Sequence, residues 1–364
     1  MVYESYVVWT NKGGTGKTTL TFHLSTEYAI KYPDKNIIVI DMCPQGNLST
    51  VLLSGVDKKM NGTDGDTNWK TILTQNENYT KTVCGYLLSK LAREPINNIP
   101  NDWFLVQPSQ YNNDITKNVY LLCGDPYLGT LAKRLEQERR VITTEQRNNP
   151  WRRITIFIKD FIDPLTEIMN RDCIVFIDTN SSFSVYTEMA IVGATRIIVP
   201  INADEFSRAA VASMLYLLYR IELGEEDNVN ERDQGDNDLE EIDFNRLAPR
   251  HGLSIPKIHL VISNRDTTYR RASSNASKAK ATEVWELLES IHRGHPNLFV
   301  SDTREGYECK LNDLHTKAVH CLQLGCPLSK LPNPVKMHGF LKVFNSHRGR
   351  INYLENLRSI INRL

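Results

Sequence analysis

A short run of glycine, lysine and threonine near the N-terminus is the part of the sequence best suited to chemistry. It comprises Lys12, Gly13, Gly14, Thr15, Gly16, Lys17, Thr18 and Thr19. Glycines let backbone N–H groups turn toward an anion, and a helix that begins at the end of the run adds the positive end of its dipole. At this spacing Lys17 would reach the β- and γ-phosphates of a nucleotide, and the Thr18 hydroxyl would ligate Mg²⁺. The run therefore predicts a phosphate-binding loop.

The sequence on either side of the run supplies the elements that must position it. The apolar segment 6–10 predicts a strand that leads into the loop, and Thr18–Tyr32 predicts a helix that Pro33 ends. Because strand, glycine-rich turn and helix N-terminus occur together, a chance glycine-rich turn is a poor explanation of the run.

The loop resembles the deviant Walker A motif of the ParA/MinD ATPases. Asn11 stands where the standard motif has its first glycine, and Lys12 stands where these ATPases carry an additional lysine. The resemblance implies that Lys12 reaches across a nucleotide-sandwich homodimer to the partner's phosphates, where a second positive charge stabilises the transition state. It also implies that the cofactors are ATP and Mg²⁺.

Three later segments are similar to other motifs of this family, in the same order, so the resemblance extends from Tyr3 to Arg265. They are Ile40–Asn47 (usually D-x-D-P-Q-G-N), Phe176–Ser182 (the Walker B strand, usually I-D-T-P-P-S) and Val199–Phe206. The resemblance implies that Asp178 holds the magnesium shell through water, and that Asn264, at the end of a later strand, contacts adenine. A strand-end surface asparagine explains Asn264 equally well.

The resemblance assigns roles to the following residues. The catalytic candidates are Lys12, Lys17 and Asp41. The cofactor-binding candidates are Gly13, Gly14, Thr15, Gly16, Lys17, Thr18, Thr19 and Asn264. The metal-binding candidates are Thr18 and Asp178.

Two departures from the family pattern bear on the chemistry. Cys43 occupies the second acidic position of D-x-D-P-Q-G-N, which ParA-type enzymes associate with the hydrolytic water. A thiol accepts a hydrogen bond less well than a carboxylate, so we expect ATP hydrolysis to be slow. Asn180 and Ser181 replace the two prolines that usually follow the Walker B aspartate.

Apolar runs alternate with helical stretches along most of the chain. The expected strands are Tyr6–Trp9, Ile37–Ile40, Val119–Leu122, Cys173–Ile177, Ile197–Val199 and Ile258–Ile262. The helices expected after the first are Tyr127–Arg139, Trp151–Met169, Phe206–Glu222 and Thr282–Ile291. This alternation predicts an α/β fold, a P-loop NTPase with a mostly parallel, twisted sheet covered by helices on both faces.

We expect a single domain over residues 1–364 with three distinctive segments. Residues 54–80 form a polar insertion that we expect to be a loop, residues 222–243 form an acidic, mobile insertion, and residues 336–364 form a basic C-terminal segment. The acidic insertion contains eleven acidic residues and one basic residue, a net charge of −10. The remaining 42 basic and 32 acidic residues therefore carry +10, although the whole chain is neutral.

A basic body is compatible with a polyanionic partner, and non-specific DNA is the partner that the resemblance implies. The candidate DNA contacts are Arg265, Arg270, Arg271, Lys278 and Lys280, with further basic residues in the C-terminal segment. A solvated surface explains these charges as an alternative.

Composition excludes several other classes of protein. The sequence has neither a run of about 18 apolar residues nor the pattern of a signal peptide, and its seven cysteines are scattered, so we expect a cytoplasmic protein that can associate with the nucleoid.

Two features near the C-terminus have plain explanations. One group of residues could suggest zinc but matches no standard zinc spacing: His315, His320, Cys321 and Cys326. Leu354, Leu357, Ile361 and Leu364 share a helical face, as in MinD-type membrane helices, but a helix docked on the body explains them with less effort.

From the resemblance we expect an ATP-controlled dimerising switch that holds DNA in its ATP state and acts in segregation or positioning of DNA or another cargo. Hydrolysis, or a stimulating partner of the ParB kind, would release the DNA. Two alternatives stay open: a MinD-like switch positioned on a membrane, and a slowly hydrolysing ATP-binding module that signals in a mobile-element or defence system.

Overall fold

The fold is described from a computed structural model. It describes residues 3–55, 64–75, 79–92, 99–141, 149–202, 204, 206–223, 243–266, 271–312, 316–331, 335–337, 341–343 and 347–364. Most of the acidic insertion and part of the basic C-terminal segment therefore lie outside the described residues.

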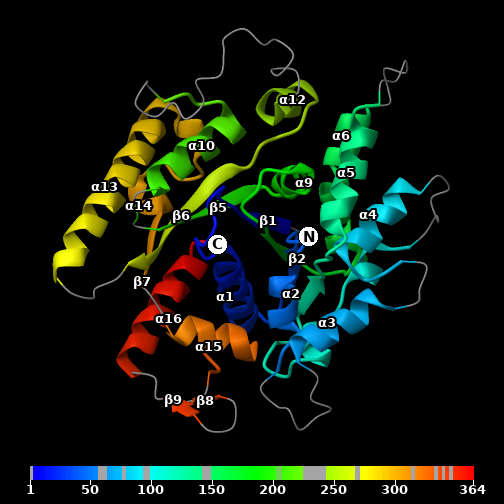
Figure 1. Cartoon of the computed structure of the whole chain (residues 1–364), viewed down its shortest axis with the longest axis horizontal. Helices are drawn as coiled ribbons and strands as arrows, with labels where there is room; N and C mark the ends of the chain where they lie inside the picture. The colour runs from blue at the N-terminus through cyan, green and yellow to red at the C-terminus, as the bar shows by residue number, and fades with distance from the viewer. Residues whose placement is uncertain are drawn as a thin grey trace.

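Seven parallel strands form the central sheet, in the order β3-β2-β4-β1-β5-β6-β7 (Figure 1). They are β1 (Tyr3–Val8), β2 (Asn36–Asp41), β3 (Val119–Leu122), β4 (Cys173–Asp178), β5 (Arg196–Asn202), β6 (Lys257–Asp266) and β7 (Glu308–Asn312). Every residue of β2 and β4 is buried, as expected for strands covered on both faces. All six expected strands are confirmed, and β1 lies near the centre of the sheet.

Helices cover both faces of the sheet, and the side chains of each strand alternate between two cores. Val7 and Trp9 belong to one core, whereas Tyr6 and Val8 belong to the other. The first core is closed by α4 (Val83–Leu91), α5 (Leu128–Arg139), α6 (Pro150–Thr155), α7 (Phe157–Ile162), α8 (Leu165–Ile168), α9 (Val185–Gly193), α10 (Ser207–Tyr219), α12 (Phe244–Arg250) and α13 (Arg271–Gly294). The second is closed by α1 (Lys17–Lys31), α2 (Asn47–Leu52), α3 (Gly65–Leu73), α15 (Thr316–Leu324) and α16 (His347–Ile361).

The remaining elements are short. They are the 3₁₀ turns η1 (Asn101–Phe104), η2 (Pro108–Gln110) and η4 (Pro296–Leu298), helix α14 (Arg304–Tyr307), and the antiparallel pair β8 (Val335–Met337) and β9 (Leu341–Val343).

The segment 54–80 is not a loop throughout, which corrects our expectation. Its second half contains α3, which begins after Asp64, whose side chain accepts a hydrogen bond from Thr67 N at 2.8 Å. Trp69 and Ile72 of α3 are buried in the second core. The polar composition of the segment hid the two apolar residues that attach this helix to the body.

The C-terminal helix α16 packs against the body through its apolar face. Tyr353, Leu357, Ile360 and Ile361 are buried in the second core, and Figure 1 shows α16 beside α1. Docking of this helix therefore accounts for the apolar stripe that the sequence shows. Across the described residues, no helix combines the length and hydropathy that crossing a bilayer requires.

Candidate nucleotide-binding site

The predicted site lies at the edge of the sheet where five neighbouring parallel strands end. At this edge Asp41 of β2 pairs in register with Asp178 of β4, and Asn202 of β5 pairs with Asn264 of β6. The glycine-rich loop leaves β1, which lies between β4 and β5. The loop is therefore flanked by two carboxylates on one side and two carboxamides on the other, at the edge where open α/β sheets bind ligands.

Glycine is required at two positions of the loop because of the backbone conformation there. Gly14 and Gly16 have φ angles of +72° and +86°, in the left-handed region that other residues rarely adopt. A Cβ atom on Gly16 would lie 2.3 Å from Asn264 Nδ2. Helix α1 begins directly after Gly16, so the loop leads into a helix N-terminus as predicted.

The two carboxamides hold the outer side of the loop. Asn264 Nδ2 donates to Thr15 O at 3.0 Å, and Asn202 Nδ2 donates to Gly14 O at 3.3 Å. Fixing these carbonyls outward leaves the loop N–H groups to bind an anion. The structure thus gives Asn264 a contact with the loop itself, and it adds Asn202, which we did not single out from the sequence.

Lys17 is buried beneath the loop, with its ammonium group bound by backbone carbonyls. Its Nζ donates to Thr10 O at 3.2 Å and to Lys12 O at 2.9 Å. Burial lowers the pKa of Lys17, while the negative charge of Asp178 opposes that shift. A triphosphate would supply the counter-charge that the carbonyls lack, so the position suits the predicted role of Lys17.

The carboxylate side of the site suits a magnesium ion. Thr18 Oγ1 donates to Asp178 Oδ2 at 2.8 Å, and Thr21 Oγ1 donates to Asp178 Oδ1 at 3.3 Å. Burial and then the neighbouring Asp41 raise the pKa of Asp178 to about 8. A buried acid pair with raised pKa gains from a divalent cation, and hydroxyl and carboxylate oxygens are ligands that Mg²⁺ prefers. Thr18 and Asp178 are the residues that would hold it.

The carboxylate of Asp41 accepts hydrogen bonds from the segment that follows β2. Its Oδ2 accepts from Ser49 Oγ at 2.7 Å and from Ser49 N at 2.9 Å, and its Oδ1 accepts from Cys43 N at 3.1 Å. It is fully buried, and burial raises its pKa. The side chain therefore fixes the segment from β2 to α2, which carries Cys43.

Cys43 lies beside the acid pair as a protonated thiol. The residue is only 4% exposed, and burial, together with the charge of Asp41, raises its pKa to about 12. Its Sγ contacts Gln45 Oε1 at 3.5 Å. Negative charge from Asp178 acts in the same direction, so the thiolate is disfavoured at neutral pH.

Lys12 points toward the β5–α10 connection of its own chain. Its Nζ forms an ion pair with Asp204 Oδ1, lies 3.5 Å from Ser207 Oγ, and sits 5.7 Å from the centre of the Phe206 ring. Asp204 and Phe206 belong to a segment that the sequence marks as family-like, but their contact with Lys12 depends on β5 lying next to β1.

The candidate DNA contacts do not lie in the loop. Arg265 belongs to β6, and Arg271, Lys278 and Lys280 belong to α13, whereas Arg270 lies outside the described residues. Of the other candidates, Gly13 and Thr19 lie in the loop and in the first turn of α1. Within the described part of the chain, His, Cys, Asp and Glu side chains form no metal cluster of three or more.

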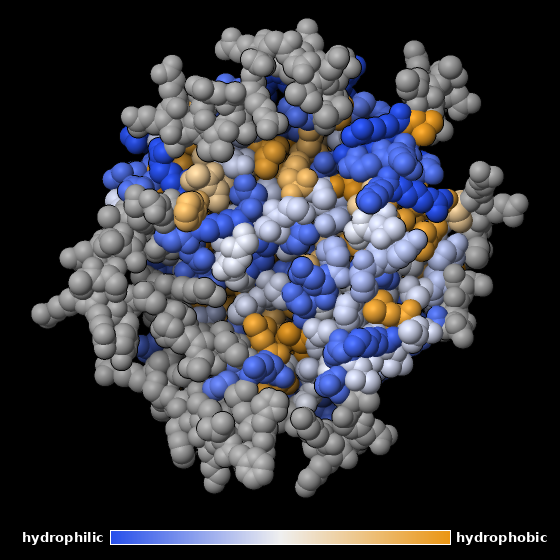
Figure 2. Space-filling model, viewed as in Figure 1, coloured by the Kyte–Doolittle hydropathy of each residue, from blue (hydrophilic) through white to orange (hydrophobic). Residues whose placement is uncertain are grey.

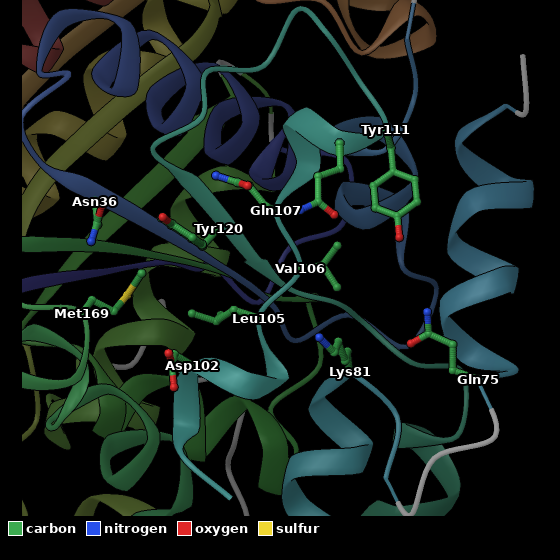
Figure 3. Close-up of a pocket in the computed structure, with 11 residues that line it drawn as sticks. Asn36, Gln75, Lys81, Asp102, Leu105, Val106, Gln107, Tyr111, Tyr120 and Met169 are labelled. Carbon is green, nitrogen blue, oxygen red and sulfur yellow. The ribbon is translucent and has the colours of Figure 1, made fainter. Parts of the chain in front are cut away.

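A separate polar pocket of about 620 Å³ opens beside the edge strand β3 (Figure 3). Its wall includes Gln107, Tyr111, Tyr120, Lys81 and Asp102, none of which belongs to the loop. Figure 2 shows that hydrophobic residues on one face of the molecule form separate small patches among hydrophilic ones. The wall of the pocket beside β3 shares no residue with the predicted nucleotide site.

Comparisons with known proteins agree with this geometry. The AAA_31 family model, described as an AAA domain, matches residues 4–230. The fold is similar to that of apo McdA from Cyanothece, with a TM-score of 0.60, 13% identity, and coverage of 100% of this chain and 99% of that one.

Two further solved structures are similar. A complex of ATP with a point variant of Cyanothece McdA has a TM-score of 0.58 and 14% identity, with 99% and 96% of the two chains covered. A plasmid partition protein from Borrelia burgdorferi B31 bound to AMPPNP has a TM-score of 0.52 and 15% identity, with 100% and 99% covered. No curated protein matches the sequence.

Proposed function

Because the chain belongs to the AAA_31 family of ParA/MinD-type P-loop ATPases, we propose that it is an ATP-dependent dimerising switch of the ParA type. In its ATP state the switch binds DNA without sequence preference, and it acts in segregation or positioning of DNA or another cargo. The observation that carries the proposal is a glycine loop with two lysines, Lys12 and Lys17, placed between an acid pair and an amide pair.

Each group at the site has a task in phosphoryl transfer to water. The loop N–H groups and Lys17 would bind the triphosphate, and Thr18 and Asp178 would hold Mg²⁺, which would neutralise phosphate charge. In the proposed dimer, Lys12 at the start of the loop serves the second subunit. Lys12 then supplies positive charge to the partner's transition state.

The test is the mass of the protein in solution with and without ATP and Mg²⁺, measured by light scattering. We expect ATP to convert a monomer into a dimer. Lys17→Ala should abolish ATP binding in calorimetry, because the buried triphosphate loses its counter-charge. Lys12→Ala should bind ATP and remain a monomer, because Lys12 serves the partner's phosphates.

Lys159→Ala is a matched control, since Lys159 of α7 is also a surface lysine in an ion pair, with Asp163. It should dimerise like the wild type. An ATP-independent mass, or a Lys12→Ala protein that still dimerises, would contradict the proposal.

A second candidate is a module that holds ATP with little turnover and signals through dimerisation. The buried, protonated thiol of Cys43 supports it, because a thiol cannot accept a proton from water as a carboxylate does. Both candidates share the ATP-bound dimer, and they differ in the rate of hydrolysis and in the need for a stimulating partner protein. The packing of α16 on α1 gives no support to a membrane-positioned switch.

A further inference from the structure

Lys12 is bound by an anion of its own subunit. Its ion pair with Asp204 is partly exposed: the two side chains retain 19% and 41% of their accessible surface. The ammonium group also faces the Phe206 ring, which is 69% exposed. Lys12 can therefore leave these partners without opening the core.

Asp204 keeps its place independently of Lys12. Its Oδ1 accepts hydrogen bonds from Phe206 N at 3.1 Å and from Ser207 Oγ at 3.0 Å, at the N-terminus of α10. Partial burial acts to raise the pKa of the carboxyl, but the bond from Lys12 and these two bonds outweigh it and lower the pKa, so the group is ionised at neutral pH. The carboxylate is thus a fixed anion beside a mobile cation.

Asp204 lies in the connection between β5 and α10, and residues on both sides of it contact the glycine loop or Asn11 just before that loop. Asn202 Nδ2 donates to Gly14 O, and Asn11 Nδ2 donates to Ser213 Oγ of α10 at 2.7 Å. The start of the loop therefore contacts the end of β5, before Asp204, and the middle of α10, after it. This arrangement fixes the direction in which Lys12 points when it has no other anion to bind.

We infer that Asp204 is a positioning residue that holds Lys12 on its own subunit until the phosphates of a bound nucleotide displace it. The contact of Lys12 across the dimer then forms by exchange of one anion for another. The inference rests on the proposed function, because it uses the dimer in which Lys12 meets the partner's phosphates. Asp204 competes with those phosphates, so it weakens dimerisation and keeps Lys12 from acting early.

The test is Asp204→Asn, which removes the charge and keeps an acceptor for Phe206 N. Exposed ion pairs contribute little, so the dissociation constant of the ATP-bound dimer should fall by about two- to fivefold. Asp204→Glu keeps the charge and should restore wild-type dimerisation. In a Lys12→Ala background, which we expect to stay monomeric, Asp204→Asn should not restore dimerisation.

Asp163→Asn is the matched control, since Asp163 is paired with a lysine and is 42% exposed, but lies just after α7. It should leave the dissociation constant unchanged. Affinity for ATP, measured below the concentration at which the protein dimerises, should be equal in all these variants. Equal or weaker dimerisation of Asp204→Asn would overturn the inference.

A second measurement uses the nucleotide-free monomer. Labelling with an amine-reactive ester, read by peptide mass spectrometry, should be faster at Lys12 in Asp204→Asn and unchanged at Lys159. Unchanged labelling at Lys12 would also overturn the inference. If the wild type fails to dimerise with ATP, the proposed function falls instead, and the labelling still decides whether Asp204 holds Lys12.

Discussion

The buried carboxylate of Asp178 makes the stability of the nucleotide-free protein depend on pH. Its pKa is about 8 in the folded chain and near 4 in an unfolded one. The folded state therefore holds a proton that the unfolded state has lost between these values, and the free energy of unfolding falls as pH rises from about 4 to about 8. Asp178→Asn removes this loss.

The test is therefore the free energy of unfolding, measured in urea without Mg²⁺ or nucleotide. Relative to the wild type, Asp178→Asn should become more stable as pH rises from about 5.5 to about 8. The gain should be on the order of 1 kcal/mol, the scale of a shift of one pKa unit. Asp163→Asn, an exposed carboxylate, should follow the wild type. Parallel pH profiles for wild type and Asp178→Asn would show that the acid pair does not hold a proton.

The thiol of Cys43 sets the rate of hydrolysis that we expect. Cys43→Asp restores a carboxylate that can orient water and accept its proton, so single-turnover hydrolysis of ATP should rise by about tenfold or more. ATP affinity should change little, because Cys43 does not belong to the loop. Cys43→Asn, similar in size and uncharged, should stay slow. If the wild type hydrolyses ATP quickly and Cys43→Asp adds nothing, another group positions the water.

At the scale of elements, the ends of β5 and β6 decide the shape of the glycine loop. Loss of the bond from Asn264 to Thr15 O should lower affinity about three- to tenfold, the effect of one hydrogen bond. A loop-holding role predicts that Asn264→Ala weakens ATP and inorganic tripolyphosphate equally in calorimetry. An adenine contact predicts a loss for ATP alone. Asn245→Ala, which removes a similar bond from Asn245 to Tyr216 O, should bind both normally.

The central strands were predictable from sequence because they are apolar without interruption. Strand β7 was not, since among residues 308–311, whose burial the structure describes, Cys309 and Leu311 alone are buried, and the strand lies at the edge of the sheet. The single helix expected over Trp151–Met169 is three helices, with Pro164 before the last. The sequence therefore indicated helix in this segment but not the two breaks in it.

The candidate site was predictable to the extent that it is local in sequence. The glycine loop, Lys17 and Thr18 follow from one run of residues, and Asp178 follows from a strand motif. Asn202 and Asp204 could not be assigned to the loop, because their contacts with it depend on the order β1-β5-β6. The sequence of one strand does not determine which strands lie beside it in the sheet.

For the molecule as a whole, the proposed binding of DNA depends on charge. Arg271→Glu and Lys278→Glu on α13 should weaken binding equally on unrelated duplexes, measured by fluorescence anisotropy. Each should also reduce the slope of log affinity against log salt by at least about one, through lost counterion release. Lys117→Glu is the control, because Lys117 is exposed and precedes β3, away from α13. Sequence-selective losses or a flat salt dependence would contradict the electrostatic account.

The order of the strands also fixes when the site can exist during synthesis. β1 pairs with β4 and β5, and the loop that follows β1 is completed by Asn264. Ribosomes add roughly 5–20 residues per second, so the glycine loop waits on the order of ten to fifty seconds for its last neighbour. For the first part of that interval, until β4 (Cys173–Asp178) has been made, β1 is an apolar segment without a partner strand. We expect chaperones, or early packing of α1 on β1, to cover this segment until its partner strands have been made.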